Sequence, residues 1–505
     1  MKWKKAMCVL LAAVAASFGV GCGTKVDDSD KTLEIAYLDA GYGYSFVTEM
    51  GKAFEKTHPD IDVVLSKSSD ITPRVLITAG PTGNSVDLFI TGADFNGMAK
   101  EGANVLKGYD CVMEPIDEVM ETEIDGKKIK DRFESGYEPT KINGHYYSFS
   151  WARGMTGLVY NKTIFEQKGY AVPNTTKQLA DLCGDIKGNG QIPFVFSSST
   201  GYWSYIRNIW YMQYQGKQGM YDMFACIDNN AYSKDVLLQK GRLVSLQTLE
   251  NLIGDAKGNN HGSVNTLSFT AAQARFIGGE GLMMVNGDWL ENEMKAVASE
   301  DANRYTIEML KTPVVSEIIE LTPTINDDAT LDKVIKYIDG DAEKSTIEGG
   351  SDEDIARIRE ARNCRYTLAF NHSVGIPVYA TAKEAAIEFL KFMATDEAQQ
   401  IYLRETNGSF MPFAYDMETH PVTWSAMSDY SKSMYSLSKD AIYFGGDERK
   451  VSGFSEWNGG RENPELFFTA KNPSDRKTAQ QIYQEEYDWW TAERWNHLLQ
   501  NAGIL

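Results

Sequence analysis

The amino-acid sequence predicts a protein of the α/β class with two domains. The chain has 505 residues, which exceeds what one hydrophobic core usually supports, so two domains are the expectation. Apolar runs with strand periodicity alternate with segments of helical periodicity, and this alternation is typical of parallel sheets flanked by helices. After the N-terminal segment no stretch reaches 18 consecutive apolar residues, so nothing later in the chain is expected to span a membrane.

The first elements of the body form a predicted βαβ unit. Residues 33–38 and 61–65 have the composition of strands. Between them, apolar side chains recur at helical spacing from Phe46 until Pro59 ends the helix. Residues 86–90 add a further buried strand. A strand, a helix and a strand within this length predict a parallel sheet.

Later segments continue the pattern. Residues 281–285 are a predicted strand, followed by a turn in which Asp288 is expected to cap a helix that begins at Trp289. Residues 383–404 predict one long amphipathic helix closed by an Asn-Gly pair, and residues 478–499 predict the last helix. Residues 325–363 are crowded with Asp, Glu and Lys, so we expect a charged surface insertion with short solvated helices there.

The N-terminus has the features of an export signal. Three lysines among the first five residues precede an apolar run that ends in small residues before Cys22. The stretch from Phe18 to Cys22 resembles a bacterial lipobox, although Gly19 stands where Leu is usual. The resemblance implies that the signal peptide 1–21 is removed, that Cys22 is lipidated and that residues 22–31 are a tether. Two acyl chains suffice for stable anchoring. The alternative is an ordinary secretory signal with an incidental cysteine.

The charge and the cysteines narrow the possible partners. The formal net charge is −20, and it becomes −23 without the signal peptide. Such an acidic surface repels nucleic acid and anionic lipid headgroups, so neither is an expected partner. The remaining cysteines, Cys111, Cys183, Cys226 and Cys364, are far apart and form no CxxC pair. We interpret them as buried small side chains, with one disulfide as the alternative, and we expect neither a metal nor a cofactor.

Four motifs, in order along the chain, resemble the extracellular solute-binding proteins of ABC importers, in the sugar-binding branch related to maltose-binding protein. The four segments are 143–151 (NGHYYSFSW), 158–173 (LVYNK, then Phe165, Gly169 and Pro173), 274–289 (ARFIGGEGLMMVNGDW) and 385–392. The first departs from the family pattern in having Ser in place of Pro. Each motif alone is weak, but four in the family's order behind a lipobox are specific. The match covers most of 32–410, fails across 325–363 and is loose after 410.

The resemblance implies a two-lobed, periplasmic-binding-protein-like fold with a hinge, in which each lobe is a mostly parallel sheet flanked by helices. Lobe one would comprise residues 32–150 and 310–402, with the charged insertion at 325–363. Lobe two would comprise residues 153–305 and 408–505. The chain would cross between the lobes near Trp151, near 309–313 and near 406–409.

Ligands of parallel sheets bind at the carboxyl ends of strands, and several loops expected there carry aromatic and charged residues. A sugar needs flat aromatic surface under its C–H face and charged groups around its hydroxyls. The ligand-binding candidates are Tyr44, Asp94, Trp151, Arg153, Trp203, Asp288, Trp289 and Trp457. Each has a structural alternative, because a tryptophan is more often a core residue than a ligand platform. Asp288 has the alternative of a helix cap, and Asp94 and Arg153 that of an ion pair between lobes.

The function predicted from the sequence is a lipid-anchored substrate-binding protein of an ABC transporter. It would bind a sugar or oligosaccharide between its lobes, close by hinge motion and deliver the ligand to permease subunits in the membrane. We expect a monomer without catalytic residues, exposed on the cell surface or in the periplasm. The alternatives are an exported carbohydrate-active enzyme, although no HExxH, GxSxG or phosphate-binding loop is present, and a surface adhesin or sensor that binds sugar without transport.

Overall fold

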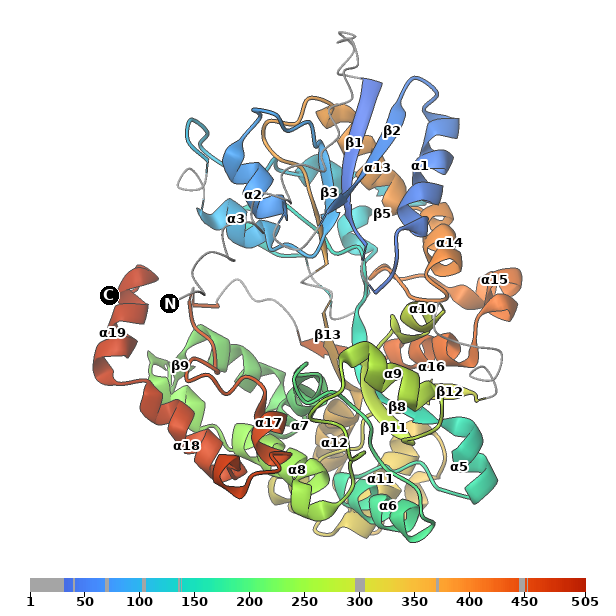
Figure 1. Ribbon diagram of the computed structural model, residues 1–505, viewed down its shortest axis with the longest axis vertical. Coiled ribbons are helices and arrows are strands. Elements are labelled where there is room, and N and C mark those ends of the chain that lie inside the picture. Colours follow the sequence, from blue (N-terminus) through green and yellow to red (C-terminus); the bar gives the residue numbers. More distant parts are fainter. Residues whose placement is uncertain are drawn as a thin grey trace, which may run out of the picture.

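The computed structural model describes residues 31–505 apart from 40, 69–71, 102–105, 135, 136, 138, 296–304, 369–371, 445–449 and 452. The predicted signal peptide and Cys22 lie outside the described residues. Two lobes stand one above the other, each around its own sheet, with helices on the outer faces (Figure 1). The predicted two-lobed α/β class is confirmed.

The upper lobe is built on a four-stranded sheet in the order β14-β3-β1-β2. Its strands are β1 (Thr32–Leu38), β2 (Asp62–Ser68), β3 (Leu88–Thr91) and β14 (Ser373–Gly375). β1 pairs in parallel with β2 and β3, whereas β14 is antiparallel to β3. Helix α1 (Ser45–Thr57) connects β1 to β2, which confirms the predicted βαβ unit. Phe46, Met50 and Phe54 of α1 are fully buried, as their spacing requires.

The other helices of the upper lobe are α2 (Thr72–Ala79), α3 (Phe95–Glu101), α4 (Asp117–Glu121), α13 (Lys383–Met393) and α14 (Asp396–Glu405). Two short hairpins accompany them, one formed by β4 (Glu123–Ile124) and β5 (Lys127–Lys128), the other by β6 (Lys141–Ile142) and β7 (His145–Tyr146). The single helix predicted over 383–404 is two helices. Thr395 separates them, because its side chain accepts a hydrogen bond from the backbone N–H of Ala398 and so starts α14.

The lower lobe has a five-stranded sheet with the path β11-β8-β13-β15, and β12 also pairs with β8. The strands are β8 (Met155–Asn161), β11 (Met283–Gly287), β12 (Ile307–Met309), β13 (Cys364–Thr367) and β15 (Ile442–Phe444). β8 is antiparallel to β11, β12 and β13, and only β13 and β15 are parallel. The mostly parallel order expected for both lobes therefore holds in the upper lobe, while the lower sheet is mixed.

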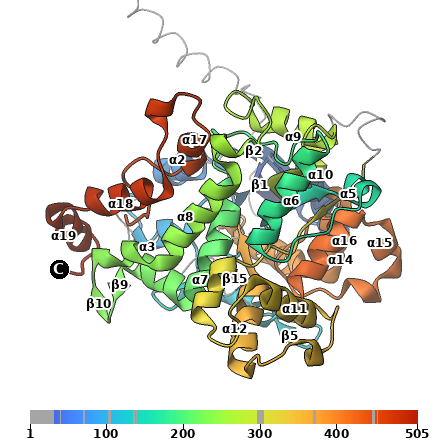
Figure 2. The same ribbon diagram turned by 90° about the horizontal axis from the view of Figure 1, so that it is seen from below.

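Helices surround this second sheet. They are α5 (Lys162–Lys168), α6 (Thr176–Gly188), α7 (Trp203–Ala225), α8 (Lys240–Ile253), α9 (Phe269–Ile277), α10 (Leu290–Met294), α11 (Asp328–Asp339), α12 (Asp352–Asn363), α15 (Pro421–Ala426), α16 (Asp429–Ser438), α17 (Pro464–Phe468), α18 (Ala479–Trp489) and α19 (Ala492–Asn501). The last helix predicted from the sequence is broken at Thr491, whose side chain caps α19. Seen from below, α17, α18 and α19 follow one side of the lobe beside α8 (Figure 2).

The charged segment 325–363 is not a solvated surface insertion of lobe one. Leu331, Val334 and Ile335 of α11 are fully buried in the core of the lower lobe, together with Ile358 of α12. The segment is amphipathic, so its charges cover the outer face while one apolar stripe packs inward. Residues 310–363 therefore belong to the lower lobe, which corrects the expected assignment.

The chain passes between the sheets at 149–154, in the connection from β13 to β14, and around 406–413. In the first two passages, which run side by side, Trp151 N–H donates to the carbonyl of His372 (2.9 Å) and Leu368 N–H donates to the carbonyl of Gly154 (2.9 Å). The crossing expected at 309–313 is wrong. β12 pairs with β8, and Leu310 N–H donates to the carbonyl of Leu158 (2.8 Å), so this segment stays within the lower lobe.

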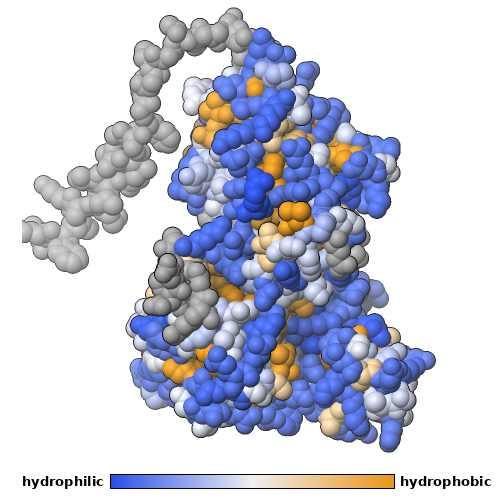
Figure 3. All heavy atoms as spheres, turned by 90° about the vertical axis from the view of Figure 1, so that its right-hand side faces the viewer, coloured by the Kyte–Doolittle hydropathy of each residue, from blue (hydrophilic) through white to orange (hydrophobic). Residues whose placement is uncertain are grey.

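The surface and the cysteines agree with a water-exposed body. On the face shown in Figure 3 the surface is mostly hydrophilic, with separate apolar patches. Within the described residues no helix is both long enough and apolar enough to cross a membrane. Cys183, Cys226 and Cys364 are buried and Cys111 is half-buried, and all four are free thiols.

Candidate functional site

Trp289 lies at the junction of the two lobes. It follows β11 of the lower sheet, yet its side chain packs in the core of the upper lobe. Its ring makes edge contacts with Tyr42 (6.1 Å between centroids) and Tyr205 (6.3 Å). The backbone must come close to this ring, because a Cβ on Gly287 would lie 2.2 Å from it. A glycine at position 287 is therefore part of how the tryptophan is positioned.

A row of tyrosines continues from Trp289 over the lower lobe. Tyr202 and Tyr205, at the start of α7, stack on each other with 5.1 Å between ring centroids, and Tyr205 stacks on Tyr366 of β13 at 5.9 Å. All three tyrosines are half-buried, and Tyr205 packs against the hydrophobic cores of both lobes. This row is the aromatic connection between the lobes.

Trp457 extends the aromatic surface on the lower lobe. Its half-buried ring lies over the guanidinium groups of Arg207 (4.8 Å) and Arg242 (5.2 Å). Both arginines are fully buried, and Glu456 pairs with both, with a distance of 3.3 Å from Arg242 Nε to Glu456 Oε2. A buried ion triad of this kind fixes its members through several charge-assisted hydrogen bonds. The indole of Trp457 is thus held on a rigid base.

Asp288 is a buried acid that joins the lobes. Its Oδ1 accepts a 2.6 Å hydrogen bond from the Tyr42 hydroxyl, and the side chain is 4% exposed. Burial raises the pKa of Asp288 to about 7, although the Tyr42 hydroxyl and the Arg153 charge act in the opposite direction. Burial likewise raises the pKa of Glu291 in the neighbouring helix α10 to about 7. The junction therefore contains carboxyl groups that titrate near neutral pH.

The arrangement is suited to holding a flat, polar molecule. Half-buried rings on the lower lobe offer apolar surface with few rotamers to restrict, whereas Trp289 at the junction is 6% exposed. Buried, paired charges behind them keep the rings in place. The described residues contain no group of three His, Cys, Asp or Glu side chains that could hold a metal ion. The geometry favours binding by stacking and hydrogen bonds.

The family model of bacterial extracellular solute-binding proteins matches residues 49–430. The chain belongs to this family. Membership places this solute-binding protein outside the cytoplasm, and the family consists of binding proteins. The sequence-based recognition of the family is confirmed.

Two curated relatives of this solute-binding protein bind sugars according to their names. The chain is 25% identical over 276 residues to the diacetylchitobiose binding protein NgcE of Streptomyces coelicolor, covering 54% of this chain and 56% of that one. It is 24% identical over 247 residues to the multiple sugar-binding protein of Streptococcus mutans, covering 47% of this chain and 53% of that one. The chain thus spans about half the length of the curated relatives it matches.

Solved structures support the fold over nearly the whole chain. The apo form of RafE from Streptococcus pneumoniae has a TM-score of 0.58 at 15% identity, covering 94% of this chain and 99% of that one. A chitin oligosaccharide binding protein has a TM-score of 0.59 at 15% identity, covering 91% of this chain and 97% of that one. The two-lobed architecture of the solute-binding protein is therefore a shared one.

Three predicted stacking residues of the solute-binding protein lie in cores, and Trp289 in the core of the upper lobe is one of them. Trp151 is fully buried between the rings of Phe46, Tyr42 and His372, and its indole N–H donates to the carbonyl of Thr91 (2.9 Å). Trp203 is 1% exposed and packs edge-on against Phe194 and Phe196. Rings enclosed in this way offer no face to a ligand, so the prediction of stacking by Trp151, Trp203 and Trp289 is corrected.

Three polar candidates have structural partners. Arg153 is 3% exposed, forms an ion pair with Glu134 and lies 4.3 Å over the Phe410 ring, which makes it a buried brace near the hinge. Asp94 is exposed and accepts a hydrogen bond from Gly97 N–H (2.8 Å) in the first turn of α3. Asp288 does not cap α10, because the residue before that helix is Trp289 and makes no side-chain cap. Its carboxylate bonds Tyr42 instead.

Tyr44 and Trp457 keep accessible surface. Tyr44 is 50% exposed and stacks on Tyr37 at 5.7 Å on the upper lobe. Sequence reasoning did not single out Tyr202, Tyr205 or Tyr366. The spacing of Tyr202 and Tyr205 could have indicated that they act together, because residues three apart share a helix face. Trp203 is rotated by about 100° from Tyr202 and lies on another face. Nothing in the local sequence of β13 marks Tyr366.

Proposed function

We propose that this protein is the substrate-binding lipoprotein of an ABC transporter and that it binds a sugar or oligosaccharide between its lobes. The family membership supports a solute-binding role. The names of the two curated relatives, which bind diacetylchitobiose and multiple sugars, support a carbohydrate as the solute. This chain matches about half the length of each relative, so the relatives' own sugars are not assigned to it. The sugar that it binds depends on the residues of its own site.

The observation that carries the proposal is the row formed by Trp289, Tyr205, Tyr202 and Tyr366, continued by Trp457 on its arginine base. The row joins residues packed in both cores, and its tyrosines and Trp457 retain accessible surface. Aromatic faces complement the C–H face of a pyranose ring. We assign ligand contact to Tyr205, Tyr366 and Trp457.

Hinge closure follows from this placement. A ligand that touches Tyr205 and Trp457 below and the Tyr42–Tyr44 loop above has all its contacts only in a closed arrangement of the lobes. It therefore shifts the population towards closure by its differential affinity for that state. The crossing segments 149–154 and 406–413, together with the connection from β13 to β14, are the connections that must absorb the motion. Permease subunits in the membrane would then take the closed, loaded form, while the diacylated Cys22 keeps the monomer at the cell membrane.

The test is a thermal-shift and calorimetric screen of the soluble protein starting after Cys22. The panel comprises maltose, maltotetraose, raffinose, cellobiose and diacetylchitobiose. We expect at least one to stabilise the protein without being cleaved. Trp457→Ala and Tyr205→Ala should each weaken that binding by roughly ten-fold or more, corresponding to about 1.4 kcal/mol. Tyr232→Ala is the matched control, because Tyr232 is 47% exposed on the hairpin of β9 (Ile227–Asp228) and β10 (Ala231–Tyr232).

Each rival function gives a different result. Release of shorter saccharides by the purified protein would establish the carbohydrate-active enzyme and end the transporter proposal. Binding without any association with permease subunits in membranes would favour the adhesin or sensor. Equal affinity of Tyr205→Ala, Trp457→Ala and wild type would remove the aromatic row from the site. Metabolic lipid labelling that is lost in Cys22→Ala tests the anchor separately.

A further inference from the structure

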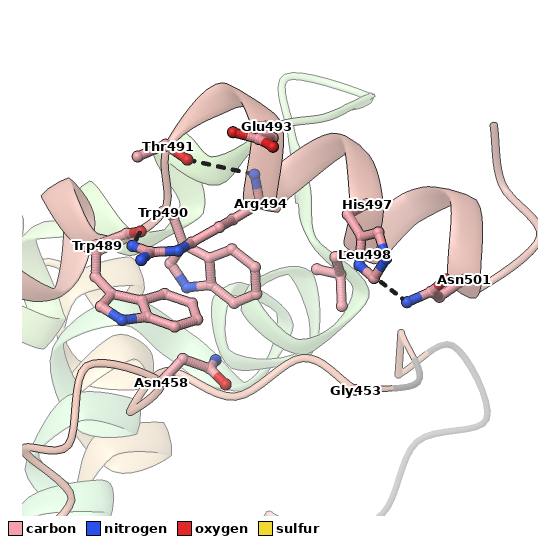
Figure 4. A pocket seen from close by; sticks show the side chains of 10 residues that line it. All are labelled: Gly453, Asn458, Trp489, Trp490, Thr491, Glu493, Arg494, His497, Leu498 and Asn501. Atoms are coloured by element: carbon pink, nitrogen blue, oxygen red, sulfur yellow. Dashed lines mark hydrogen bonds between the residues drawn. The ribbon is translucent and has the colours of Figure 1, made fainter.

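A pocket lies at one side of the lower lobe, between α19 and the loop that carries Gly453 and Asn458 (Figure 4). Its volume is about 660 Å³, within the range of small-molecule sites. The lining residues all follow residue 430, outside the stretch 49–430 that the family model matches. The pocket is therefore a feature of this chain's C-terminal segment and is separate from the aromatic row between the lobes.

Tryptophans form the wall of this pocket. Trp489 is half-buried, and Trp490 beside it is 3% exposed and stacks on Phe454 at 5.9 Å. The two indoles meet edge to face at 4.9 Å. The indole N–H of Trp490 is buried and has no hydrogen-bond partner among the described residues. A buried donor of this kind ordinarily has an acceptor, and Trp490 is one of the residues that line the pocket.

Polar groups of both signs surround the wall. The Arg494 guanidinium lies 4.4 Å over the Trp489 ring and donates to the carbonyl of Trp489 (2.6 Å), and it makes no ion pair with a described residue. Glu493 precedes it on α19 and is exposed. Asn458 faces them from the opposite loop, held by a hydrogen bond from its amide to the carbonyl of Ser455. The rim thus offers donors and acceptors without a net charge of one sign.

We infer that this pocket is a second carbohydrate site, which binds a neutral saccharide on the outer surface of the lower lobe. A neutral polyhydroxylated ring matches the accessible features of the pocket: a C–H face for the half-buried Trp489 indole, and hydroxyls for Asn458 and Arg494. A strongly anionic ligand would meet Glu493 and the acidic protein surface. The site does not depend on binding between the lobes. It gives the protein a place to hold a glycan chain at the surface.

The test uses ¹⁹F NMR of the protein labelled with 5-fluorotryptophan, in which Trp489→Phe identifies the resonance of Trp489. The probes are maltotetraose, cellotetraose, chitotetraose and raffinose, each up to about 10 mM so that weak surface binding is detected. We expect at least one probe to shift the Trp489 and Trp490 resonances. Asn458→Ala and Arg494→Ala should weaken that titration at least ten-fold, while Arg476→Ala, a surface arginine of the same lobe outside the pocket, should leave it unchanged.

A second variant separates this inference from the function proposed above. Tyr205→Ala should leave the Trp489 and Trp490 titration intact even if it abolishes binding between the lobes. If none of the probes moves the two resonances, or if Asn458→Ala and Arg494→Ala titrate like wild type, the second site is wrong. Shifts caused only by an anionic probe such as glucuronate would also overturn it. Far-ultraviolet circular dichroism shows whether a variant that has lost the Trp489 shift is still folded. If Arg494→Ala is unfolded, the titration of Arg494→Lys, which keeps the charge, decides the outcome.

Discussion

The hydroxyl of Tyr42 donates a 2.6 Å hydrogen bond to Oδ1 of Asp288. The bond joins the loop after β1 in the upper lobe to the end of β11 in the lower lobe, and both side chains are buried. Hydrogen bonds to charged groups contribute more than neutral ones, and an acceptor left without its donor in a buried place is costly. The bond is therefore one of the contacts that set the relative position of the lobes.

Tyr42→Phe should lower the free energy of unfolding by about 1–3 kcal/mol, because it removes only the donor and leaves Asp288 buried. Urea denaturation followed by circular dichroism measures the change. Tyr232→Phe, on an exposed ring, is the matched control and should stay within about 0.5 kcal/mol of wild type. An unchanged midpoint for Tyr42→Phe would mean that the bond does not brace the junction.

The raised pKa of Asp288 predicts a pH dependence of stability with a definite sign. The pKa is about 7 in the folded protein and 3.8 in the unfolded chain, so the folded state binds more protons between these values. The free energy of unfolding therefore falls as pH rises from about 4 to 7 and levels off above 7, by up to roughly 4 kcal/mol for this group. Asp288→Asn should remove that part of the slope.

Other buried carboxyl groups with raised pKa values change the unfolding free energy with pH in the same direction. The contribution of Asp288 is therefore isolated only by comparing wild type with Asp288→Asn. The pKa of Glu291 is raised to about 7 and that of Glu465 to about 8, in both cases mainly by burial. The informative quantity is the difference in unfolding free energy between wild type and Asp288→Asn at each pH. A difference that is constant from about pH 4 to pH 8 would contradict a raised pKa at Asp288.

Gly287→Ala should displace the Trp289 ring. The added Cβ would lie 2.2 Å from it, closer than any real contact allows. We expect a loss of about 1–3 kcal/mol in stability from overpacking, together with weaker binding between the lobes. Gly184→Ala is the matched control, since a Cβ at this exposed position within α6 meets nothing within 4 Å. That variant should be neutral or up to about 1 kcal/mol more stable.

The sequence predicted the elements better than it predicted which side of an element faces the site. The strand and helix periodicities of 33–65 specify the βαβ unit locally, and it forms as expected. At the start of α7 the sequence analysis chose Trp203, the largest ring. One residue along a helix turns the side chain by about 100°, so Trp203 enters the core while Tyr202 and Tyr205 line the junction.

Long-range pairing explains the other differences. The Tyr42–Asp288 bond spans 246 residues, and no local pattern marks it. The rings of Tyr366 and Tyr205 stack because β13 pairs with β8 in the lower sheet. The local periodicity of residues 310–367 does not specify this pairing. The average charge of 325–363 hid a helical stripe of apolar side chains that is fully buried. Periodicity, rather than composition, was the informative property of that segment.

The buried Arg362 gives a direct test of the placement of this charged segment. Its guanidinium pairs with Asp339 (2.7 Å) and donates to the carbonyls of Lys311 and Thr312 (3.1 Å each), which connects α12, α11 and the strand exit after β12. Arg362→Met should cost about 3–5 kcal/mol, because two buried carbonyls lose this donor and Asp339 keeps only Lys311 (2.7 Å) as a charged partner. Arg359→Met, on the exposed side of the same helix, should change stability by less than about 0.5 kcal/mol. Urea unfolding of the pair decides between the two placements, since a solvated insertion would tolerate both substitutions equally.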